Sequence, residues 1–246
     1  LGAAESEQQI GNVSGANIDT SSVTLNLGEI YGVGVGVLGK GLSLERLGVI
    51  STDGTVSNIK ITATSKNISS SGAGISSVGS IVLGSVSGNA VSNDTIKIKS
   101  GSLTAKGIGI DSNASIAIGE LSNVSQFNTN ISVGDVMSSA VSVGSSSVIQ
   151  VGYDISKSSI LVSENLNIGD ISSYADIAAD AKSEIVVGSI FSALTSPESI
   201  KITTGNLLSK VEGAVGGTHG IFIGNIYSGS GNISHQSGNI TSVSEA

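Results

Sequence analysis

The sequence of 246 residues has no cysteine, no tryptophan, one proline and only 3% aromatic residues. Without cysteine, the chain can form neither disulfide bonds nor thiolate metal sites. Charged residues make up 12% of the chain, about half of the usual share, and the net charge is −8. Because the few Lys and Arg residues form no basic stripe, we expect no binding of nucleic acid or of an anionic membrane.

Long hydrophobic runs are missing as well. The longest nearly apolar run, residues 31–39, is too short to span a bilayer, so we expect no insertion into a membrane. What the chain does contain is 34 Gly and 48 Ser among many Ile, Val and Leu residues. Aliphatic residues interrupted by Gly and Ser favour β-strands, and the positive mean hydropathy argues against a disordered chain.

One phrase recurs from end to end: apolar, any residue, apolar, Gly, any residue, apolar, small. Two copies, IAIGELS and ISVGDVM, lie close together in residues 116–137. The positions that hold the central Gly, here called the anchors, are Gly11, Gly28, Gly48, Lys66 in place of Gly, Gly84, Gly101, Gly119, Gly134, Gly152, Gly169, Gly188, Gly205, Gly224 and Gly238. Self-similarity at a nearly fixed period indicates a repeat architecture.

Apolar residues alternate with other residues inside each unit, as in IVLGSVS (81–87) and IFIGNIY (221–227). This period of two is typical of half-buried strands, and a second alternating patch follows several units, for example Ile108 and Ile110. The only segments with a helical alternative are residues 172–184 and 206–214.

A unit of 17–18 residues cannot bury an apolar face by itself, but stacked units can. We therefore predict an all-β fold, a parallel β-solenoid or stacked β-arches with about fourteen repeats, as a single repeat domain over residues 1–246. One unit per rung would give a rod roughly 65 Å long, and two units per coil would give half that length. An irregular β-sandwich with coincidental periodicity is the competing fold.

Motifs that carry chemistry are weak in this sequence. Gly34-x-Gly36-x-x-Gly39 matches a dinucleotide fingerprint, but the required helix and acidic residue are not expected around it. His219 and His235 have no second ligand at metal-binding spacing, so we interpret them as turn or surface histidines. We predict no catalytic residue, no cofactor-binding or metal-binding residue, and no enzymatic activity.

Acidic and amide residues often follow the anchors. If all units stacked directly, Glu120 and Asp135 would lie on consecutive rungs of one column, where a calcium ion could bridge them. The Asp-rich nonapeptide of calcium-binding solenoids is missing, which favours a solvated polar ladder. Asn residues in such a column are expected to form hydrogen bonds along the stack.

Eight sites fit the Asn-x-Ser/Thr pattern for N-glycosylation. They are Asn12, Asn67, Asn93, Asn113, Asn123, Asn130, Asn232 and Asn239. Several of them arise from the repeat phrase itself, so the number exceeds chance only modestly. Glycosylation is expected only if the protein is secreted by an organism that glycosylates Asn.

The repeat units resemble those of secreted repetitive β-solenoid and β-arch surface proteins, such as haemagglutinin-like adhesins and the filament and sheath proteins of bacteria and archaea. The resemblance covers the whole chain but rests on the repeat phrase alone, so it identifies no specific family and transfers no functional residue. It implies an extracellular or cell-surface location. The first residue, Leu1 rather than Met, would fit removal of a signal peptide.

The phrase is already present at residues 10–14 and still present at residues 237–242, without evident capping segments. Uncapped solenoid ends expose β-edges that pair with other chains. We therefore predict a structural subunit that polymerises with itself into a filament, sheath or matrix, with Ile10–Ser14 and Ile233–Thr241 as contacts. The alternatives are an adhesin, a carbohydrate- or ice-binding module, and a polysaccharide-acting enzyme, for which acids and aromatic platforms are too few.

Overall fold

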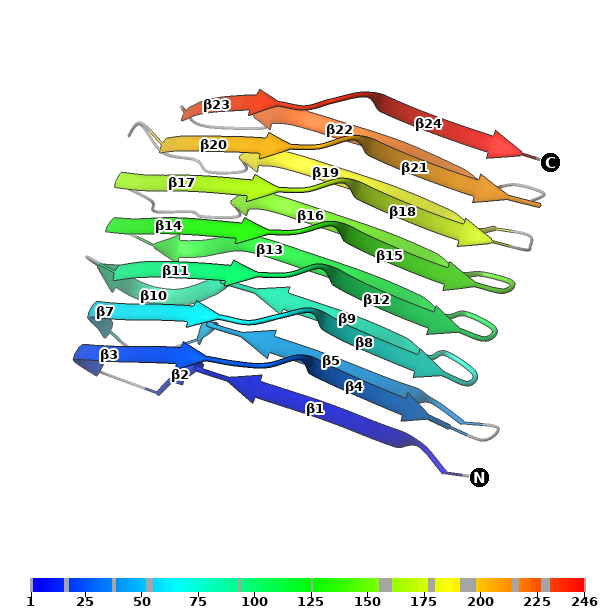
Figure 1. Cartoon of the computed structure of the whole chain (residues 1–246), viewed down its shortest axis with the longest axis horizontal. Coiled ribbons are helices and arrows are strands. Elements are labelled where there is room, and N and C mark those ends of the chain that lie inside the picture. Colours follow the sequence, from blue (N-terminus) through cyan, green and yellow to red (C-terminus); the bar gives the residue numbers. More distant parts are fainter. Residues whose placement is uncertain are drawn as a thin grey trace.

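A computed structural model describes residues 2–15, 18–36, 39–51, 55–92, 94–124, 126–154, 161–176, 180–190, 198–213, 217–226 and 231–245. The strands of these residues wind into a parallel β-solenoid, which confirms the predicted all-β class (Figure 1). No helix occurs in the described ranges. The helical alternatives were wrong: β18 (Ile171–Asp176) and β21 (Leu207–Glu212) occupy those segments as strands.

Three stacks of parallel strands form the walls of the solenoid, here called ladders A, B and C. Ladder A contains β1 (Ala4–Ile10), β5 (Gly41–Leu47), β9 (Val78–Leu83), β13 (Asn113–Val124), β16 (Ser146–Asp154), β19 (Lys182–Ile190) and β22 (Thr218–Ile226). Ladder B contains β3 (Ile18–Asn26), β7 (Thr55–Thr64), β11 (Asp94–Ser100), β14 (Gln126–Val133), β17 (Leu161–Ile168), β20 (Glu198–Thr204) and β23 (Gly231–Gln236).

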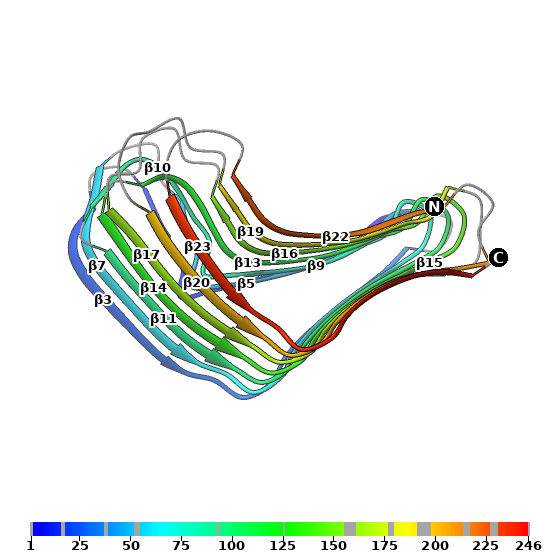
Figure 2. The same ribbon diagram turned by 90° about the horizontal axis from the view of Figure 1, so that it is seen from above.

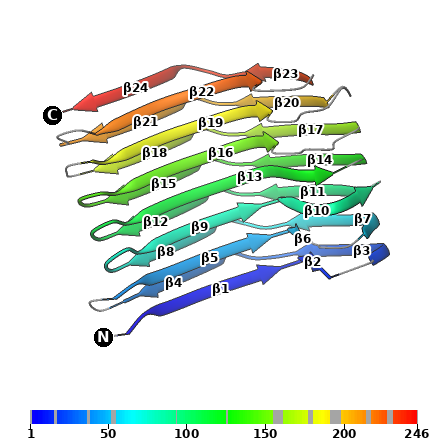
Figure 3. The ribbon, with the colours of Figure 1, turned by 180° about the vertical axis from the view of Figure 1, so that it is seen from behind.

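Ladder C contains β4 (Ile30–Val35), β8 (Ile68–Ala73), β12 (Leu103–Ile108), β15 (Val136–Val141), β18, β21 and β24 (Ile240–Glu245). The shorter strands β2 (Val13–Ser14) and β6 (Ile50–Ser51), together with β10 (Val86–Ser92), follow ladder A in the first three layers. Figure 3 shows the same stack from behind.

One coil of the solenoid contains two repeat units. Ala4 pairs with Gly41, 37 residues further along the chain, and Asn113 pairs with Ser146, 33 residues further along. Ladder C is accordingly seven strands deep. Six spacings of about 4.8 Å give a stack roughly 29 Å high, so the larger of the two predicted coil sizes is the right one.

The cross-section is a bent wedge, wide between ladders A and B and narrow between ladders A and C (Figure 2). The wide part holds a mostly aliphatic core in which each side chain lies on its counterpart in the next layer. Fully buried members of this core include Leu47, Ile61, Leu83, Ile96 and Ile118. This stacking is what the alternation of apolar residues predicted.

The narrow part is packed with Gly and Ser because its two sheets lie too close for larger side chains. A Cβ atom on Gly34 would lie 2.1 Å from the carbonyl oxygen of Leu42, and one on Gly79 would lie 2.1 Å from that of Lys106. Buried serines bridge the sheets: the Ser173 hydroxyl donates to the carbonyl of Ser147 at 3.0 Å, and the Ser183 hydroxyl donates to that of Ser173 at 2.8 Å.

The anchors separate into two columns with different backbone conformations. The first column lies within or directly after the strands of ladder A, and its members all have positive φ between 60° and 67°: Gly11, Gly48, Gly84, Gly119, Gly152, Gly188 and Gly224. The left-handed conformation explains why each of these positions is Gly. The second column, at the bend between ladders B and C, contains the remaining anchors and has no positive φ.

Backbone hydrogen bonds connect successive members of the second column. The N–H of Gly134 donates to the carbonyl of Gly101 at 3.1 Å, and Gly205 donates to Gly169 at 3.0 Å. Lys66 can take a place in this column because its φ is not in the left-handed region.

Candidate functional site

The first and seventh layers leave most of their inward apolar side chains half-buried, although Val13 and Ile30 are buried, whereas the five layers between them bury theirs. The partly buried hydrophobic residues that pack against the core are Ile10, Ile18, Val23, Leu25, Leu27, Ile221, Ile223 and Ile233, all in these two layers. Both predicted contact segments, Ile10–Ser14 and Ile233–Thr241, belong to the same layers. Within the described residues, no segment covers either end of the stack (Figure 1).

Three inward register positions are aliphatic in both end layers, whereas two others differ: the column that begins at Leu25 ends at His235, and the column that begins at Gln8 ends at Ile221. The ladder A column that begins at Ile10 ends at Ile223, and the ladder B column that begins at Val23 ends at Ile233. The ladder C column that begins at Ile30 ends at Ile240. A second copy placed on the seventh layer would therefore meet aliphatic residues with aliphatic residues in these three columns.

A polar ladder runs beside the second anchor column, as predicted for the residues that follow the anchors. The Asp135 carboxylate accepts the backbone N–H of Asp170 at 3.0 Å, and the Asp170 carboxylate accepts the N–H of Asn206 at 2.7 Å. The next step joins the Asn206 side-chain oxygen to the N–H of Asn239 at 2.9 Å. From the fourth layer onward each layer thus offers an acceptor to the layer after it, and Asn239 stands at the end of this series.

The predicted pairing of Glu120 with Asp135 was wrong. Glu120 belongs to ladder A and pairs with Tyr153, whereas Asp135 lies beside Asp170 at the other corner of the coil. The difference arises because each coil contains two anchors, so consecutive units occupy different corners. Among the described residues, no group of three or more His, Asp or Glu side chains could hold a metal ion.

Three carboxyl groups lie inside the core, where the sequence pattern did not identify them: those of Glu45, Asp94 and Glu164, the last in the column that begins at Val23. Glu45 and Asp94 are each 1% exposed. The Ser43 hydroxyl donates to Glu45 at 3.2 Å, and the Ile59 N–H donates to Asp94 at 2.6 Å. Burial raises the pKa of the Glu45 carboxyl, and it raises the pKa of Asp94 to about 6. Both interrupt the apolar alternation of their strands, which is the signal that marks them.

The two histidines lie in the seventh layer. His219 is exposed and aligns with the buried serine column through Ser183; its Nδ1 atom is 2.5 Å from the Ser242 hydroxyl. His235 is half-buried at an inward position of β23, and burial lowers its pKa. The surface interpretation is therefore confirmed for His219 and wrong for His235. Neither has a carboxylate partner among the described hydrogen bonds and ion pairs.

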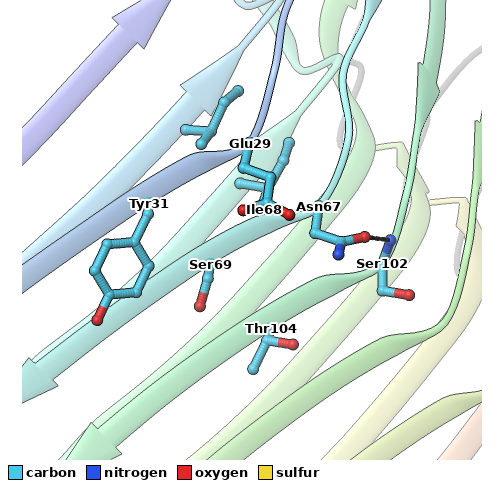
Figure 4. A pocket seen from close by; sticks show the side chains of 8 residues that line it. Glu29, Tyr31, Asn67, Ile68, Ser69, Ser102 and Thr104 are labelled. Atoms are coloured by element: carbon cyan, nitrogen blue, oxygen red, sulfur yellow. Dashed lines mark hydrogen bonds between the residues drawn. The ribbon is translucent and has the colours of Figure 1, made fainter.

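A shallow hollow lies at the bend between ladders B and C in the first three layers (Figure 4). Tyr31, 65% exposed, stands at one side of it, and Asn67 crosses it to accept the N–H of Ser102 at 3.0 Å. Glu29 lines the same hollow. One aromatic ring and one carboxylate give no pair of acids for hydrolysis.

Six predicted glycosylation sites have a described side chain. Asn67, Asn113, Asn130, Asn232 and Asn239 are exposed, and Asn12 is half-buried. Asn93 and the side chain of Asn123 lie outside the described residues. Asn12 and Asn67 each accept a backbone N–H from the next layer, so these two side chains also connect neighbouring layers of the solenoid.

The Gly34-x-Gly36-x-x-Gly39 segment contains β4 and no helix in its described part, so the dinucleotide-binding context is missing there. The part of the chain that the structure describes has no helix long and apolar enough to cross a membrane. No protein-family model, no curated protein and no solved structure matches this chain.

Proposed function

We propose that the protein is a non-enzymatic structural subunit that assembles end to end, so that the seventh layer of one copy continues into the first layer of the next. The observation that carries this proposal is that three inward columns are aliphatic in both end layers. Each inward column that begins with an aliphatic residue at Ile10, Val23 or Ile30 ends with an isoleucine in the seventh layer. The contact does not close on itself, so repetition produces a filament.

Three kinds of interaction support the contact. Parallel β-edges of all three ladders would pair with the next copy. The half-buried aliphatic residues of both end layers would leave water, at about 25 cal/mol per Å² of apolar surface. The side-chain oxygen of Asn239 would accept the backbone N–H at the Glu29 position of the next copy, which repeats the bond that Asn206 makes to Asn239.

A filament, sheath or matrix outside the cell is the setting that we propose for such a polymer. Successive subunits of this polymer would be joined by the same β-pairing and aliphatic packing that join the layers inside each subunit. A β-stack with few charged residues suits this role because like charges directly above one another would destabilise neighbouring layers.

Paired charge substitutions test the proposal. Ile223→Lys with Ile233→Lys places two cations at inward positions of the seventh layer, and Phe222→Lys with Ser234→Lys places them at adjacent outward positions of the same strands. Negative-stain microscopy and sedimentation of the purified chain should show concentration-dependent fibres for the wild type and the outward variant. The inward variant should remain monomeric with unchanged β circular dichroism.

Dispersed monomers of the wild type at all concentrations would overturn the proposal. So would fibres of the inward variant that match those of the wild type, because two buried ammonium groups at the contact cost several kcal/mol.

A further inference from the structure

The outer surface of ladder B differs from the rest of the molecule in its charge. Its outward positions are those that align with Ser22, Thr24 and Asn26 through the seven strands. The described side chains at these positions are Ser, Thr, Asn, Gln and Lys, without a carboxylate or an aromatic ring. In a chain with a net charge of −8, every charged side chain at these positions is a lysine, while Asp19, earlier in β3, and Asp135 and Asp170, at the bend, lie outside them.

The lysines concentrate in the second and third layers. Lys97 pairs with Thr62 and Lys99 with Thr64, while Lys60 pairs with Thr95, so their side chains stand on adjacent strands. Lys66 follows at the bend of the second layer, where it is also exposed. Within the described residues none of these four lysines forms an ion pair, whereas Arg46, Lys182 and Lys210 do.

A shallow hollow of about 280 Å³ lies beside Lys97 and Lys99 on the outer surface of ladder B. It crosses β7, β11 and β14, and its polar lining consists of Thr62, Thr64, Lys97, Lys99, Asn130 and Ser132. The hollow therefore offers hydroxyl, amide and ammonium groups side by side. Figure 2 shows that this surface faces away from ladders A and C.

We infer that the outer face of ladder B binds a linear anionic polysaccharide. Ammonium groups attract the carboxylate or sulfate groups of such a chain, and the hydroxyl and amide groups exchange hydrogen bonds with sugar hydroxyls. The absence of aromatic rings from the described positions of this face disfavours single-stranded nucleic acid, whose bases need a stacking platform. The absence of large apolar side chains there disfavours a lipid surface.

The geometry also gives the polysaccharide a direction. Lys97, Asn130, Asn165 and Lys201 occupy one outward column parallel to the stacking axis. Three strand spacings of about 4.8 Å separate the two lysines by roughly 14 Å, with two amides between them. A chain that lies along this column meets an ammonium group at each end and amide groups in the middle.

Two triple variants of equal net charge test the inference. Lys60→Gln, Lys97→Gln and Lys99→Gln remove three cations from the face; Lys40→Gln, Arg46→Gln and Lys182→Gln remove three from outside ladder B. Binding is measured on immobilised polygalacturonate and dextran sulfate, with methyl-esterified polygalacturonate and dextran as uncharged counterparts. Circular dichroism verifies that both variants fold.

We expect the wild type to bind a charged polysaccharide and to lose affinity as salt rises. The face variant should bind at least about tenfold more weakly, and the control variant within about twofold of the wild type. Binding of both charged probes would indicate recognition of anionic groups in general, and binding of polygalacturonate alone would identify a polyuronate.

Three results would overturn the inference. The first is no binding to either charged polysaccharide, and the second is an equal loss in both triple variants, which would indicate non-specific charge attraction. The third is tighter binding to single-stranded DNA than to either polysaccharide. Because all these measurements use the surface of ladder B, they are independent of whether the end layers assemble.

Discussion

At the scale of single residues, Asp94 is the clearest departure from an aliphatic interior. It aligns with Ile59 in the preceding layer, whose backbone N–H it accepts. Burial raises its pKa to about 6, more than the hydrogen bond from Ile59 lowers it. The protonated form is thus favoured in the folded state, and ionisation at neutral pH weakens the fold.

Asp94→Asn should remove this weakness and its dependence on pH. Below about pH 4 Asp94 is protonated in both the folded and the unfolded state, so wild type and variant differ little. Between about pH 4 and 6 the unfolded state loses its proton first, and the wild-type free energy of unfolding falls as pH rises. At pH 7 the variant should be more stable by up to about 3 kcal/mol.

Urea unfolding at pH 4, 5, 6 and 7 measures this difference in the monomeric Ile223→Lys, Ile233→Lys background. Asp135→Asn is the matched control, because Asp135 is exposed. Equal pH dependence of Asp94→Asn and the wild type would contradict the expectation.

Lys66 shows that a side chain fits at an anchor of the second column only where the preceding layer makes no polar-ladder bond. A Cβ atom on Gly169 would lie 2.4 Å from Asp135 Oδ1, and one on Gly205 would lie 2.1 Å from Asp170 Oδ1. The residue that corresponds to Asp135 and Asp170 in the layer before Lys66 is Glu29. No described hydrogen bond joins the Glu29 side chain to the second layer. A side chain at position 66 therefore does not displace a ladder bond.

At the scale of elements, the close contact of ladders A and C depends on the buried serines. Ser173 on β18 has no exposed surface and lies between Ser147 of β16 and Ser183 of β19, with hydroxyl oxygens 2.8 and 3.0 Å away. Each hydroxyl fills a small space and also forms a hydrogen bond with the neighbouring serine. The two sheets can approach because no larger side chain stands at these positions.

Ser173→Val should destabilise the fold by about 2–4 kcal/mol, since it adds volume to a close-packed seam and removes the hydroxyl that donates to the Ser147 carbonyl and accepts from the Ser183 hydroxyl. Ser172→Val, at the adjacent outward position of β18, should change the free energy of unfolding by less than about 0.5 kcal/mol. Urea unfolding of both variants measures this, and similar effects of the two substitutions would show that the seam is loosely packed.

Strand periodicity predicted the strands but not the corners of the coil. The phrase around Gly119 and the phrase around Gly134 look alike, yet the first Gly has a φ of 63° and the second has no positive φ. The sequences of the two phrases do not reveal this difference in backbone conformation. The alternation of Lys97 and Lys99 with Ile96 and Ile98 indicates that these two lysines point outward. That Lys60 lies on the same face follows only from the register of β7 and β11.

At the scale of the whole molecule, each layer contacts its neighbours along the stack, so stability is distributed layer by layer. Removal of one complete coil should therefore leave a shorter solenoid. Deletion of residues 113–145 joins Ser112 to Ser146 and places β16 on β9, with Ile149 on Ile81 and Val151 on Leu83. Both end layers remain, so this variant should fold and still form fibres.

Deletion of residues 116–130 removes one repeat unit instead of one coil. It joins Ser115 to Ile131 and leaves an intact phrase, ISVGDVM, so the sequence pattern alone predicts a tolerated change. The structure predicts the opposite, because the remnants of β13 and β14 fuse into a single strand and the fourth layer can then supply ladder A or ladder B but not both. Circular dichroism and urea unfolding should show a cooperative fold for the coil deletion and its loss for the unit deletion. Equal stability of the two would mean that a single unit forms a rung, against the register of all three ladders.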